Sequence, residues 1–537
     1  MSIKNFRHIH LTNPTSLIHR DKLISQLTST KEWDIIIIGG GASGLGIAVD
    51  AASRGFKTIL FEQYDFAKGT SSKSTKLLHG GVRYLAQGDI KLVIEALEER
   101  GHLEKNARHL FKKLEFIIPN YTWWKGPYYL IGLKLYDWLS KRLSLGGSKF
   151  ISKKTVLKRL PTLKSKGLAN GSSYFDGQFD DARLAINLAQ TAIELGAVCL
   201  NYVKVERFNK NTNDLIESIE VRDNETRKSY TLKGRAIINA TGIFTDSVLK
   251  MYNPNHKKTV IPSQGIHLML DGSFLESEKA IMIPKTSDGR VLFIIPWHTK
   301  VIAGTTDTLI KKPKIEPIPL QEEVDFILET INQYLTKTAT RSDVLSVFSG
   351  LRPLAKPSND TLTTKEVSRS HKIIIDNNLI SIIGGKWTTY RQMAEDVVNQ
   401  IIESFHFQKV PCKTEQISIH GNVSEKLILP DHLSFYGSDL ESYLEFEKSN
   451  PEYAEKIHPN YAFTKGQIIW SIQHEMACTV EDFLSRRIRL LLLDAQAAQE
   501  AAFIVASVMA KSLGKDSKWE ENELLSFKKL VDKYIIH

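Results

Sequence analysis

Residues 34 to 46 read Asp34-Ile-Ile-Ile-Ile-Gly39-Gly-Gly41-Ala-Ser-Gly44-Leu-Gly46, and this stretch decides the fold. An apolar strand runs directly into a glycine-rich turn and then into a helix of small residues. Gly39 permits the tight turn, Gly41 lets backbone N–H groups approach a pyrophosphate, and Gly44 lets the helix pack closely on the strand. The N-terminus of this helix adds partial positive charge, which stabilises bound phosphate.

The residues that follow complete one βαβ unit. The pattern predicts a helix over 44–53 and a second strand over 57–61 that ends at Glu62. A carboxylate at this place can accept hydrogen bonds from both ribose hydroxyls of an adenosine. A lone glycine motif is weak evidence, but strand, spacing, helix and acidic residue agree here. The sequence therefore predicts a dinucleotide-binding domain of the Rossmann-like α/β class.

Other segments are typical of loops that return to a bound nucleotide. A dense hydroxyl run begins at Thr70-Ser71-Ser72 and leads to His79, a glycine pair and Arg83, which suits a loop around a phosphorylated cofactor. A flexible surface loop is the alternative interpretation. A second apolar strand over 235–239 ends in the turn Ala240-Thr241-Gly242. A further glycine-rich turn, Gly384-Gly385-Lys386-Trp-Thr388, opens a helix and is a second candidate for anion contact.

The rest of the chain predicts two more structural units. Residues 259–305 are rich in strand-forming residues and predict a mixed or antiparallel sheet inserted into the nucleotide domain as a substrate roof. Beyond about residue 405 the pattern is helical. We expect an N-terminal extension (1–33), a nucleotide-binding domain with an interleaved substrate domain (34–405) and a C-terminal helical domain (406–537). Arg486, Arg487 and Arg489 are expected to form structural ion pairs.

Composition narrows the class of protein. Hydrophobic residues make up 42% and charged residues 24% of the 537 residues, which excludes a disordered, collagen-like or heptad-repeat chain. The net charge of +11 favours anionic partners such as phosphates, acidic lipid or nucleic acid. No recognisable nucleic-acid module or long basic tract supports the last of these. Three cysteines without a CxxC pair exclude a zinc ribbon and fit a reducing compartment, and no metal site is expected.

A segment rich in aromatic and basic residues raises the question of membrane contact. Residues 121–147 interleave aromatics such as Trp123, Trp124 and Trp138 with lysines and an arginine, as an interfacial anchor does. An ordinary amphipathic helix with its aromatics in the core is the alternative. No uncharged apolar run reaches the roughly eighteen residues that a bilayer span needs. Residues 1–33 lack a secretory signal; they are either a plain extension or an organellar transit segment, since no acidic residue precedes Asp21.

Seven ordered motifs together carry a resemblance to a known family. They are the glycine turn with Glu62, Thr70-Ser71-Ser72, His79-Gly-Gly-x-Arg83-Tyr84, Ala240-Thr241-Gly242, Gly304-Thr-Thr-Asp307, Gly350-x-Arg352-Pro353 and Gly384-Gly385-Lys386-x-Thr388. In this combination the chain resembles the FAD-dependent glycerol-3-phosphate dehydrogenases. The likeness runs from about Asp34 into the helical C-terminal domain. Phe244 departs from it, because the family more often has Trp after the Ala-Thr-Gly turn.

The resemblance implies an activity and a location. It implies oxidation of sn-glycerol 3-phosphate to dihydroxyacetone phosphate by hydride transfer to FAD, with electrons passed to a membrane quinone. It also implies a cytoplasmic protein bound peripherally to the anionic inner face of the cell membrane. A homodimer is a further expectation, and nucleic acid is not expected as a partner.

The resemblance also suggests which residues form the site. Arg83, Tyr84, His267, Arg352, Arg369 and Lys386 fall on positions that line the substrate site, and His79 neighbours the flavin. The expected cofactor contacts are Gly39, Gly41, Gly44, Glu62, Thr70, Ser71, Ser72, His79, Ala240, Thr241, Gly242, Gly350, Gly385, Lys386 and Thr388.

The chemistry of the reaction agrees with these roles. Oxidising a secondary alcohol by hydride transfer needs a base for the hydroxyl proton, and an imidazole suits that role near neutral pH. His267 is the first candidate and His79 the second. Arg352 and Arg369 are expected to bind the phosphate, because the planar guanidinium fork matches it, and Arg83 is expected beside the reacting oxygen. Lys386 is expected to stabilise developing negative charge.

Two related activities remain as alternatives. A glycerol-3-phosphate oxidase would use the same active site and deliver electrons to molecular oxygen. An amino-acid oxidase-like flavoenzyme would share the nucleotide domain, but its substrate carboxylate needs only one arginine. Several cations in this chain suit a phosphate better.

Overall fold

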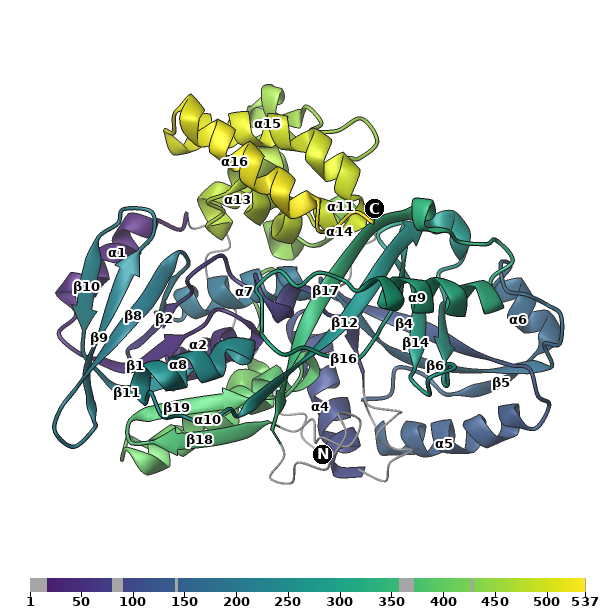
Figure 1. Cartoon of the computed structure of the whole chain (residues 1–537), viewed down its shortest axis with the longest axis horizontal. Helices are drawn as coiled ribbons and strands as arrows, with labels where there is room; N and C mark the ends of the chain where they lie inside the picture. The colour runs from purple at the N-terminus through teal and green to yellow at the C-terminus, as the bar shows by residue number, and fades with distance from the viewer. Residues whose placement is uncertain (1–16, 80–89, 141–142, 357–370, 426–428, 537) are drawn as a thin grey trace, which may run out of the picture.

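The fold begins with a six-stranded, mostly parallel sheet. The computed structural model describes residues 17–79, 90–140, 143–356, 371–425 and 429–536, and the structural statements below concern these residues. The sheet lies on the left in Figure 1, in the order β18-β19-β11-β1-β2-β7. All neighbours are parallel except the edge strand β18, which is antiparallel to β19. The strands are β1 (Trp33–Ile38), β2 (Thr58–Phe61), β7 (Val198–Leu200), β11 (Gly234–Asn239), β18 (Lys372–Asp376) and β19 (Leu379–Ile383).

Helices bury this sheet, as a parallel sheet requires. Helix α2 (Ala42–Ser53) follows the glycine-rich turn and packs against α7 (Asp181–Glu194) and α10 (Tyr390–Ser404). Helix α8 (Thr245–Tyr252) packs against β19 and against β8. The expected βαβ unit is present; the helix starts two residues earlier than the pattern indicated, because Gly41 is its N-cap.

A small meander and the first helix extend this part of the molecule. The meander is β8 (Val203–Lys210), β9 (Ile216–Asp223) and β10 (Ser229–Leu232), all antiparallel. Helix α1 (Arg20–Ser29) packs against β7 and β10 and buries Leu23 and Leu27. Arg20 forms an ion pair of 2.8 Å with Asp223. Residues 20–29 of the expected N-terminal extension are therefore folded against the nucleotide domain.

The second sheet is mixed and has ten strands, of which eight follow one another in order and two pair at its sides. Its order is β16-β12-β15-β14-β13-β4-β6-β3, with β17 paired to β12 and β5 paired to β6. Its neighbours are antiparallel except β13 and β4, which are parallel. The strands are β3 (Leu77–Leu78), β4 (Phe111–Asn120), β5 (Lys149–Ser152), β6 (Asn170–Phe179), β12 (Val260–Asp271), β13 (Ala280–Ile283), β14 (Leu292–Trp297), β15 (Lys300–Gly304), β16 (Thr308–Leu309) and β17 (Val344–Ala355).

This is the inserted sheet that residues 259–305 indicated, but it also recruits strands from earlier in the chain. Its nearby helices are α4 (Ile90–Asn106), α5 (Lys125–Ser140), α6 (Lys153–Arg159) and α9 (Gln321–Tyr334). Helix α9 packs against β12 and β15 and buries Val324, Ile327 and Ile331. Helix α5 packs against β5, β6 and α4. The mixed α/β fold with an inserted sheet is confirmed.

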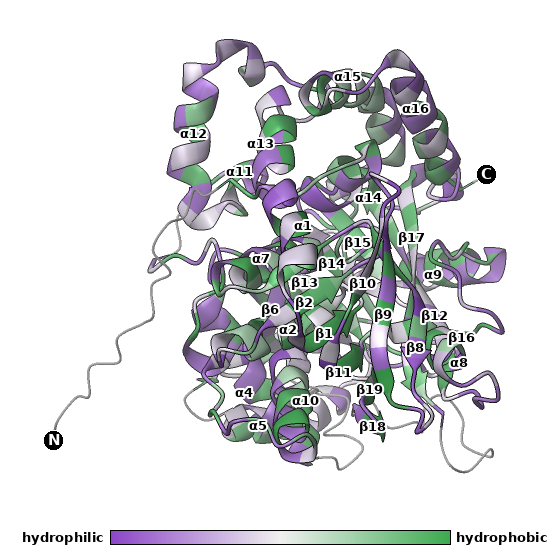
Figure 2. Cartoon of the chain, turned by 90° about the vertical axis from the view of Figure 1, so that its left-hand side faces the viewer, coloured by the Kyte–Doolittle hydropathy of each residue, from purple (hydrophilic) through white to green (hydrophobic). Residues whose placement is uncertain are grey.

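The C-terminal helices form a separate layer at the top of Figure 1. They are α11 (Asp431–Ser434), α12 (Leu440–Ser449), α13 (Lys465–Glu475), α14 (Leu490–Leu493), α15 (Ala495–Leu513) and α16 (Ser517–Val531). Short helical turns elsewhere in the fold include η1 (Thr70–Ser72), η3 (Gly242–Phe244), η5 (Arg341–Asp343), η6 (Trp387–Thr389) and the π-helical η10 (Asp482–Arg487). Figure 2 shows mainly hydrophobic ribbon in the central strands and mixed polarity in the outer helices α12 and α16. One buried cluster joins the C-terminal helices to the second sheet.

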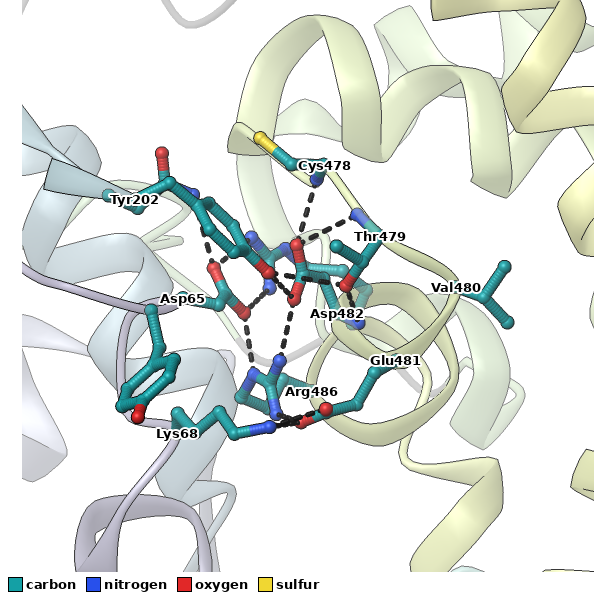
Figure 3. A network of polar contacts seen from close by, with 12 residues as sticks. Asp65, Lys68, Tyr202, Cys478, Thr479, Val480, Glu481, Asp482 and Arg486 are labelled. Carbon is teal, nitrogen blue, oxygen red and sulfur yellow. Dashed lines mark hydrogen bonds and ion pairs between the residues drawn. The ribbon is translucent and has the colours of Figure 1, made fainter. Parts of the chain in front are cut away.

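A buried network of charged side chains joins the helical layer to the nucleotide domain (Figure 3). Asp65 follows β2 and accepts hydrogen bonds from Arg486 Nε at 2.5 Å and from Arg487 Nη1 at 2.6 Å. Lys68 pairs with Glu481, which also accepts from Arg486. Burial alone would raise the pKa of Asp65, but the two guanidinium groups hold it below its usual range. Arg489 pairs with Asp180 at 2.7 Å, so all three arginines form the structural ion pairs that the sequence analysis expected.

Candidate active site

The glycine-rich turn brings three backbone segments into close contact. Gly39 has φ of +110°, and a Cβ atom there would lie 2.7 Å from the Ala240 carbonyl oxygen. A Cβ on Gly44 would lie 1.9 Å from the Gly39 carbonyl oxygen. Larger residues therefore cannot replace these glycines without moving the backbone. The turn after β1 consequently lies directly beside the turn after β11, as expected for neighbouring parallel strands.

Glu62 is oriented toward the start of α2. Its Oε2 accepts a hydrogen bond of 2.7 Å from the Gly40 N–H, and its Oε1 accepts one of 2.9 Å from the Tyr64 N–H. Burial raises the pKa of Glu62 above its ordinary value. The carboxylate thus lies at the end of β2 beside the glycine turn, where the sequence pattern placed a ribose ligand.

The hydroxyl-rich segment that begins at Thr70 connects the two glycine-rich turns. Ser71 Oγ accepts from the Ala42 N–H at 3.0 Å, and the Ser71 carbonyl accepts from Trp387 Nε1 at 2.8 Å. Thr70 Oγ1 donates to the Leu351 carbonyl at 2.6 Å. Turn η1 therefore forms hydrogen bonds with the first glycine turn, with the second glycine turn and with β17.

These segments enclose one large cavity of about 590 Å³. It runs from the glycine turn and Glu62 past the turns at Ala240 and Gly385 to His267 and Arg352. The cavity is long and lies between both sheets, with backbone N–H groups and a carboxylate at one end and cations at the other. These residues fit FAD: Glu62 and the backbone N–H groups of the glycine turn would hold its adenosine and phosphates, and His267 and Arg352 would face the substrate beside its ring.

His267 lies on β12 at the far end of the cavity and is almost fully buried. Its Nε2 is hydrogen bonded to Thr75 Oγ1 at 2.9 Å, and its ring stacks on Phe348 with 5.0 Å between the ring centroids. Burial, together with the positive charges of Arg352 and Lys76, holds the pKa of His267 well below its ordinary value of 6.5. The imidazole is therefore neutral at pH 7 and able to accept a proton.

The guanidinium of Arg352 is held by oxygen atoms from β12 and from the turn after β15. Its Nη1 donates to the Thr306 carbonyl at 3.1 Å and to the Gln264 carbonyl at 3.4 Å. Its Nη2 donates to Thr305 Oγ1 at 3.1 Å, and Asp307 lies 3.8 Å from Nη1. The side chain remains 26% exposed and lines the cavity, which leaves it accessible to an anionic ligand.

Comparison with known proteins identifies two matching family models. Residues 34–388 match the model described as FAD dependent oxidoreductase. Residues 378–520 match the model described as C-terminal domain of alpha-glycerophosphate oxidase. The first match covers almost all of both sheets and nearly all residues that line the cavity.

Named relatives and a solved structure agree over almost the whole chain. The mitochondrial glycerol-3-phosphate dehydrogenase of Schizosaccharomyces pombe is 38% identical over 93% of this chain and 87% of its own. The human mitochondrial enzyme is 37% identical over 95% of this chain and 75% of its own. The chain belongs to the FAD-dependent glycerol-3-phosphate dehydrogenases. The X-ray structure of the family member from Bacillus halodurans, complexed with FAD, superposes with a TM-score of 0.78 at 28% identity and covers 96% of this chain and 98% of its own.

The structure brings most of the expected dehydrogenase site residues into the cavity. Among the substrate-site candidates, His267, Arg352 and Lys386 line it, as does His79, which was expected beside the flavin. His79 Nδ1 lies 3.9 Å from the buried carboxylate of Asp176, and its ring lies 5.1 Å from that of Phe293. Arg83, Tyr84 and Arg369 lie outside the described residues.

The expected cofactor contacts divide into a lining group and a supporting group. Those that line the cavity are Gly39, Gly41, Glu62, Thr70, Ser71, His79, Ala240, Thr241, Gly242, Gly350, Gly385, Lys386 and Thr388. Gly44 instead packs on the Gly39 carbonyl, and the Ser72 carbonyl accepts from Lys76 Nζ at 2.6 Å. These two residues shape the cavity from behind.

Three residues of this dehydrogenase site had no role in the sequence analysis. Thr75 forms a hydrogen bond with His267, and Thr305 accepts one from Arg352. The fully buried Lys76 forms an ion pair with Asp181, and its positive charge helps to lower the pKa of His267. Thr75 and Lys76 belong to the polar run that begins at Thr70, and Thr305 belongs to the Gly304-Thr-Thr-Asp307 motif. Their presence in motifs was a usable signal, but their contacts depend on strands distant in the chain.

Proposed function

We propose that the chain oxidises sn-glycerol 3-phosphate to dihydroxyacetone phosphate with FAD as its cofactor. One observation carries the proposal: a neutral, buried imidazole and an accessible guanidinium meet at the end of a cavity whose other end fits a dinucleotide. When bound, FAD supplies a ring that accepts hydride from the carbinol carbon. The roles below are those of the chain's own residues.

His267 is the base in this proposal. It accepts the proton of the substrate's secondary hydroxyl at Nε2, the nitrogen that contacts Thr75, while Nδ1 is buried. Thr75 and Phe348 fix the orientation of the ring. The low pKa of His267 keeps the ring unprotonated before substrate binds, which a base requires. His79, beside Asp176, is the second candidate for the same role.

Arg352 binds the phosphate group, and Lys386 stabilises negative charge at the reacting oxygen. The guanidinium of Arg352 is oriented by three oxygens, and a positive charge held in one direction at the cavity favours an anionic phosphoester over an uncharged alcohol. Arg83, Tyr84 and Arg369 are further proposed substrate ligands. This use of several cations for one ligand also favours a phosphoester over an amino acid.

An anaerobic titration of the purified holoenzyme tests the proposed function. Addition of glycerol 3-phosphate is expected to bleach the flavin absorbance, whereas glycerol at the same concentration leaves it unchanged. Bleaching by an amino acid but not by glycerol 3-phosphate would overturn the substrate. In the same assay His267→Ala is expected to slow bleaching, and Arg352→Ala to raise the substrate concentration that it needs. Negligible effects of both changes would place the site elsewhere.

We also propose that the electrons pass to a quinone at a membrane surface. Helix α5 and the turn before it expose Trp123, Ile131 and Trp138 by 73% or more, and the chain carries a net charge of +11. Among the described residues, no helix is long and apolar enough to cross a bilayer. The exposed aromatic face with basic neighbours supports peripheral attachment to a membrane, and the inner face of the cell membrane is the proposed location. Cell fractionation checks the location, and light scattering checks the expected homodimer.

The acceptor distinguishes the dehydrogenase from the oxidase alternative. The exposed aromatic face favours the quinone, because a membrane-dissolved acceptor has to be reached at the bilayer surface. A soluble quinone analogue is expected to support turnover at a far higher rate than dissolved oxygen. Release of hydrogen peroxide in proportion to the substrate consumed, in the presence of the quinone, would identify an oxidase instead.

A further inference from the structure

Glu323 is a buried carboxylate at the start of α9, outside the cavity itself. Its Oε1 accepts hydrogen bonds of 2.7 Å from Thr306 Oγ1 and from Thr308 Oγ1. Its Oε2 accepts one of 2.7 Å from Gln264 Nε2 and one of 3.1 Å from the Leu320 N–H. The residue is only 3% exposed. Each carboxylate oxygen therefore has two donors.

A buried charge of this kind is costly to maintain. Among the described residues no lysine, arginine or histidine lies within ion-pair distance of Glu323. The four hydrogen bonds and the N-terminus of α9 stabilise its carboxylate. Capping alone does not explain the burial, because Asp343 likewise accepts from the N–H of the N-cap residue Thr340 at η5 and does so at the surface. The burial of Glu323 therefore points to a role beyond starting the helix.

The residues that Glu323 holds are those that orient Arg352. The Thr306 and Gln264 carbonyl groups accept from Arg352 Nη1. Thr305, which accepts from Arg352 Nη2, is joined by a peptide bond to Thr306. Thr306 Oγ1 also accepts from the Ile266 N–H at 3.1 Å, which connects the same hydroxyl to β12 beside His267. Two side-chain contacts of one carboxylate thus fix the oxygens around the guanidinium.

We propose that Glu323 is a positioning residue for the phosphate-binding guanidinium of Arg352. It acts by locking the turn at 305–308 against β12, so that the fork of Arg352 is presented in one direction. A bidentate contact to phosphate depends on this direction, because two parallel N–H···O bonds form only when the fork and the oxygens are coplanar. This inference rests on the proposed role of Arg352 as a phosphate ligand.

The first test compares Glu323→Gln with Glu322→Gln in the holoenzyme, assayed with an artificial electron acceptor. Both changes remove one negative charge from the first turn of α9, but Glu322 is exposed. In Glu323→Gln an amide NH₂ faces two donors that lose their acceptor. We expect KM for glycerol 3-phosphate, and Ki for inorganic phosphate as a competitive inhibitor, to rise about tenfold. The value of kcat is expected to stay within about twofold, and Glu322→Gln to resemble the wild type.

A double variant tests whether Glu323 acts through Arg352. If it does, Glu323→Gln adds little to the KM of Arg352→Ala, because the group that it orients is gone. Equal factors in both backgrounds, or a loss of kcat with unchanged KM, would overturn the inference and show a general structural role. If Arg352→Ala itself leaves KM unchanged, the proposed phosphate ligand is wrong and the inference falls with it.

A milder pair of variants covers the case in which Glu323→Gln does not fold. Thr306→Val and Thr308→Val each remove one hydrogen bond to the same oxygen of Glu323. Only Thr306 also contributes an oxygen to Arg352. Thr306→Val is expected to raise KM severalfold more than Thr308→Val, at equal flavin content and thermal stability. Equal KM values for the two variants would overturn the inference.

Discussion

At the scale of single residues, Gly44 shows how little tolerance the cofactor turn has. A Cβ atom there would lie 1.9 Å from a backbone oxygen, whereas a Cβ on Gly132, also within a helix, meets nothing within 4 Å. Gly44→Ala is expected to destabilise the protein by about 3 kcal/mol or more and to lower its FAD content, because β1 and α2 must separate. Gly132→Ala is expected to stabilise it by up to about 1 kcal/mol. Denaturant unfolding and the flavin absorbance per protein check both, and normal FAD content in Gly44→Ala would contradict the turn geometry.

The buried imidazole of His420 makes the stability of the fold depend on pH. Its Nδ1 lies 2.5 Å from Glu194 and its Nε2 lies 2.7 Å from Asp439. Burial alone would lower the pKa of His420, but the two carboxylates raise it to about 10. The charged imidazole therefore stabilises the fold fully below the unfolded pKa near 6.5, and this stability is lost as the pH rises toward 10.

The variant His420→Gln tests whether this stabilisation decreases as the pH rises. The free energy of unfolding of the variant is expected to be lower than that of the wild type by a few kcal/mol at pH 6, on the order set by the pKa shift. The difference should shrink steadily between pH 6.5 and pH 10. The exposed His19→Gln is the control and should show little difference at any pH. A difference of constant size across the pH range would mean that His420 contributes packing and no charge.

At the scale of elements, the π-helical turn η10 is fixed to the segment after β2 by Asp65. Asp65→Asn would leave the buried guanidinium groups of Arg486 and Arg487 without their shared carboxylate. Removing one partner of such a network is expected to cost about 3 to 5 kcal/mol of unfolding free energy. Glu278→Gln, which removes an exposed ion pair with Lys112, is the control and should cost less than about 1 kcal/mol.

Chemical unfolding of both variants, followed by circular dichroism, gives these values. Because Asp65 lies between Glu62 and Lys68, which both line the cavity, Asp65→Asn is also expected to release FAD more readily. A variant as stable as the wild type would show that the helical layer is held by its apolar contacts alone. In that case the arginines would contribute no net stability despite their burial.

Local elements could be predicted from the sequence far better than the contacts between them. The turn at Gly39 and the strand that ends at Glu62 are specified by neighbouring residues, so pattern and structure agree within two residues. Asp65 and Arg487 are more than 400 positions apart in the sequence, and no local pattern pairs them. Thr75 and His267 are 192 positions apart and Thr306 and Glu323 are 17 apart, and no local pattern pairs them either. The functional groups could be named in advance, but the residues that orient them required the fold.

At the scale of the whole molecule, the cavity and the exposed aromatic face adjoin the same strand, β6, of the inserted sheet. Tyr174 and Asp176 of β6 line the cavity, and helix α5 packs on that strand. Tyr136 of α5 donates a hydrogen bond of 3.2 Å to Asp176, which lies 3.9 Å from His79. The helical layer with α15 and α16 lies at the opposite end of the molecule in Figure 1. The proposed membrane surface is therefore adjacent to the cavity, and α15 and α16 are remote from that surface.

This arrangement gives a prediction with an internal control. A variant with Trp123→Ser, Ile131→Ser and Trp138→Ser loses the exposed apolar face of the α5 region, and we expect its affinity for vesicles of phosphatidylglycerol and phosphatidylcholine to fall at least tenfold. The control carries Phe503→Ser and Leu525→Ser, which are 64% and 58% exposed on the helical layer. It should bind vesicles like the wild type. Co-sedimentation measures the affinity, and reduction of the flavin by glycerol 3-phosphate in solution should be the same in all three proteins. An equal loss of vesicle affinity in the two variants would contradict the prediction. It would show that exposed apolar side chains in general, and not the α5 face, decide binding.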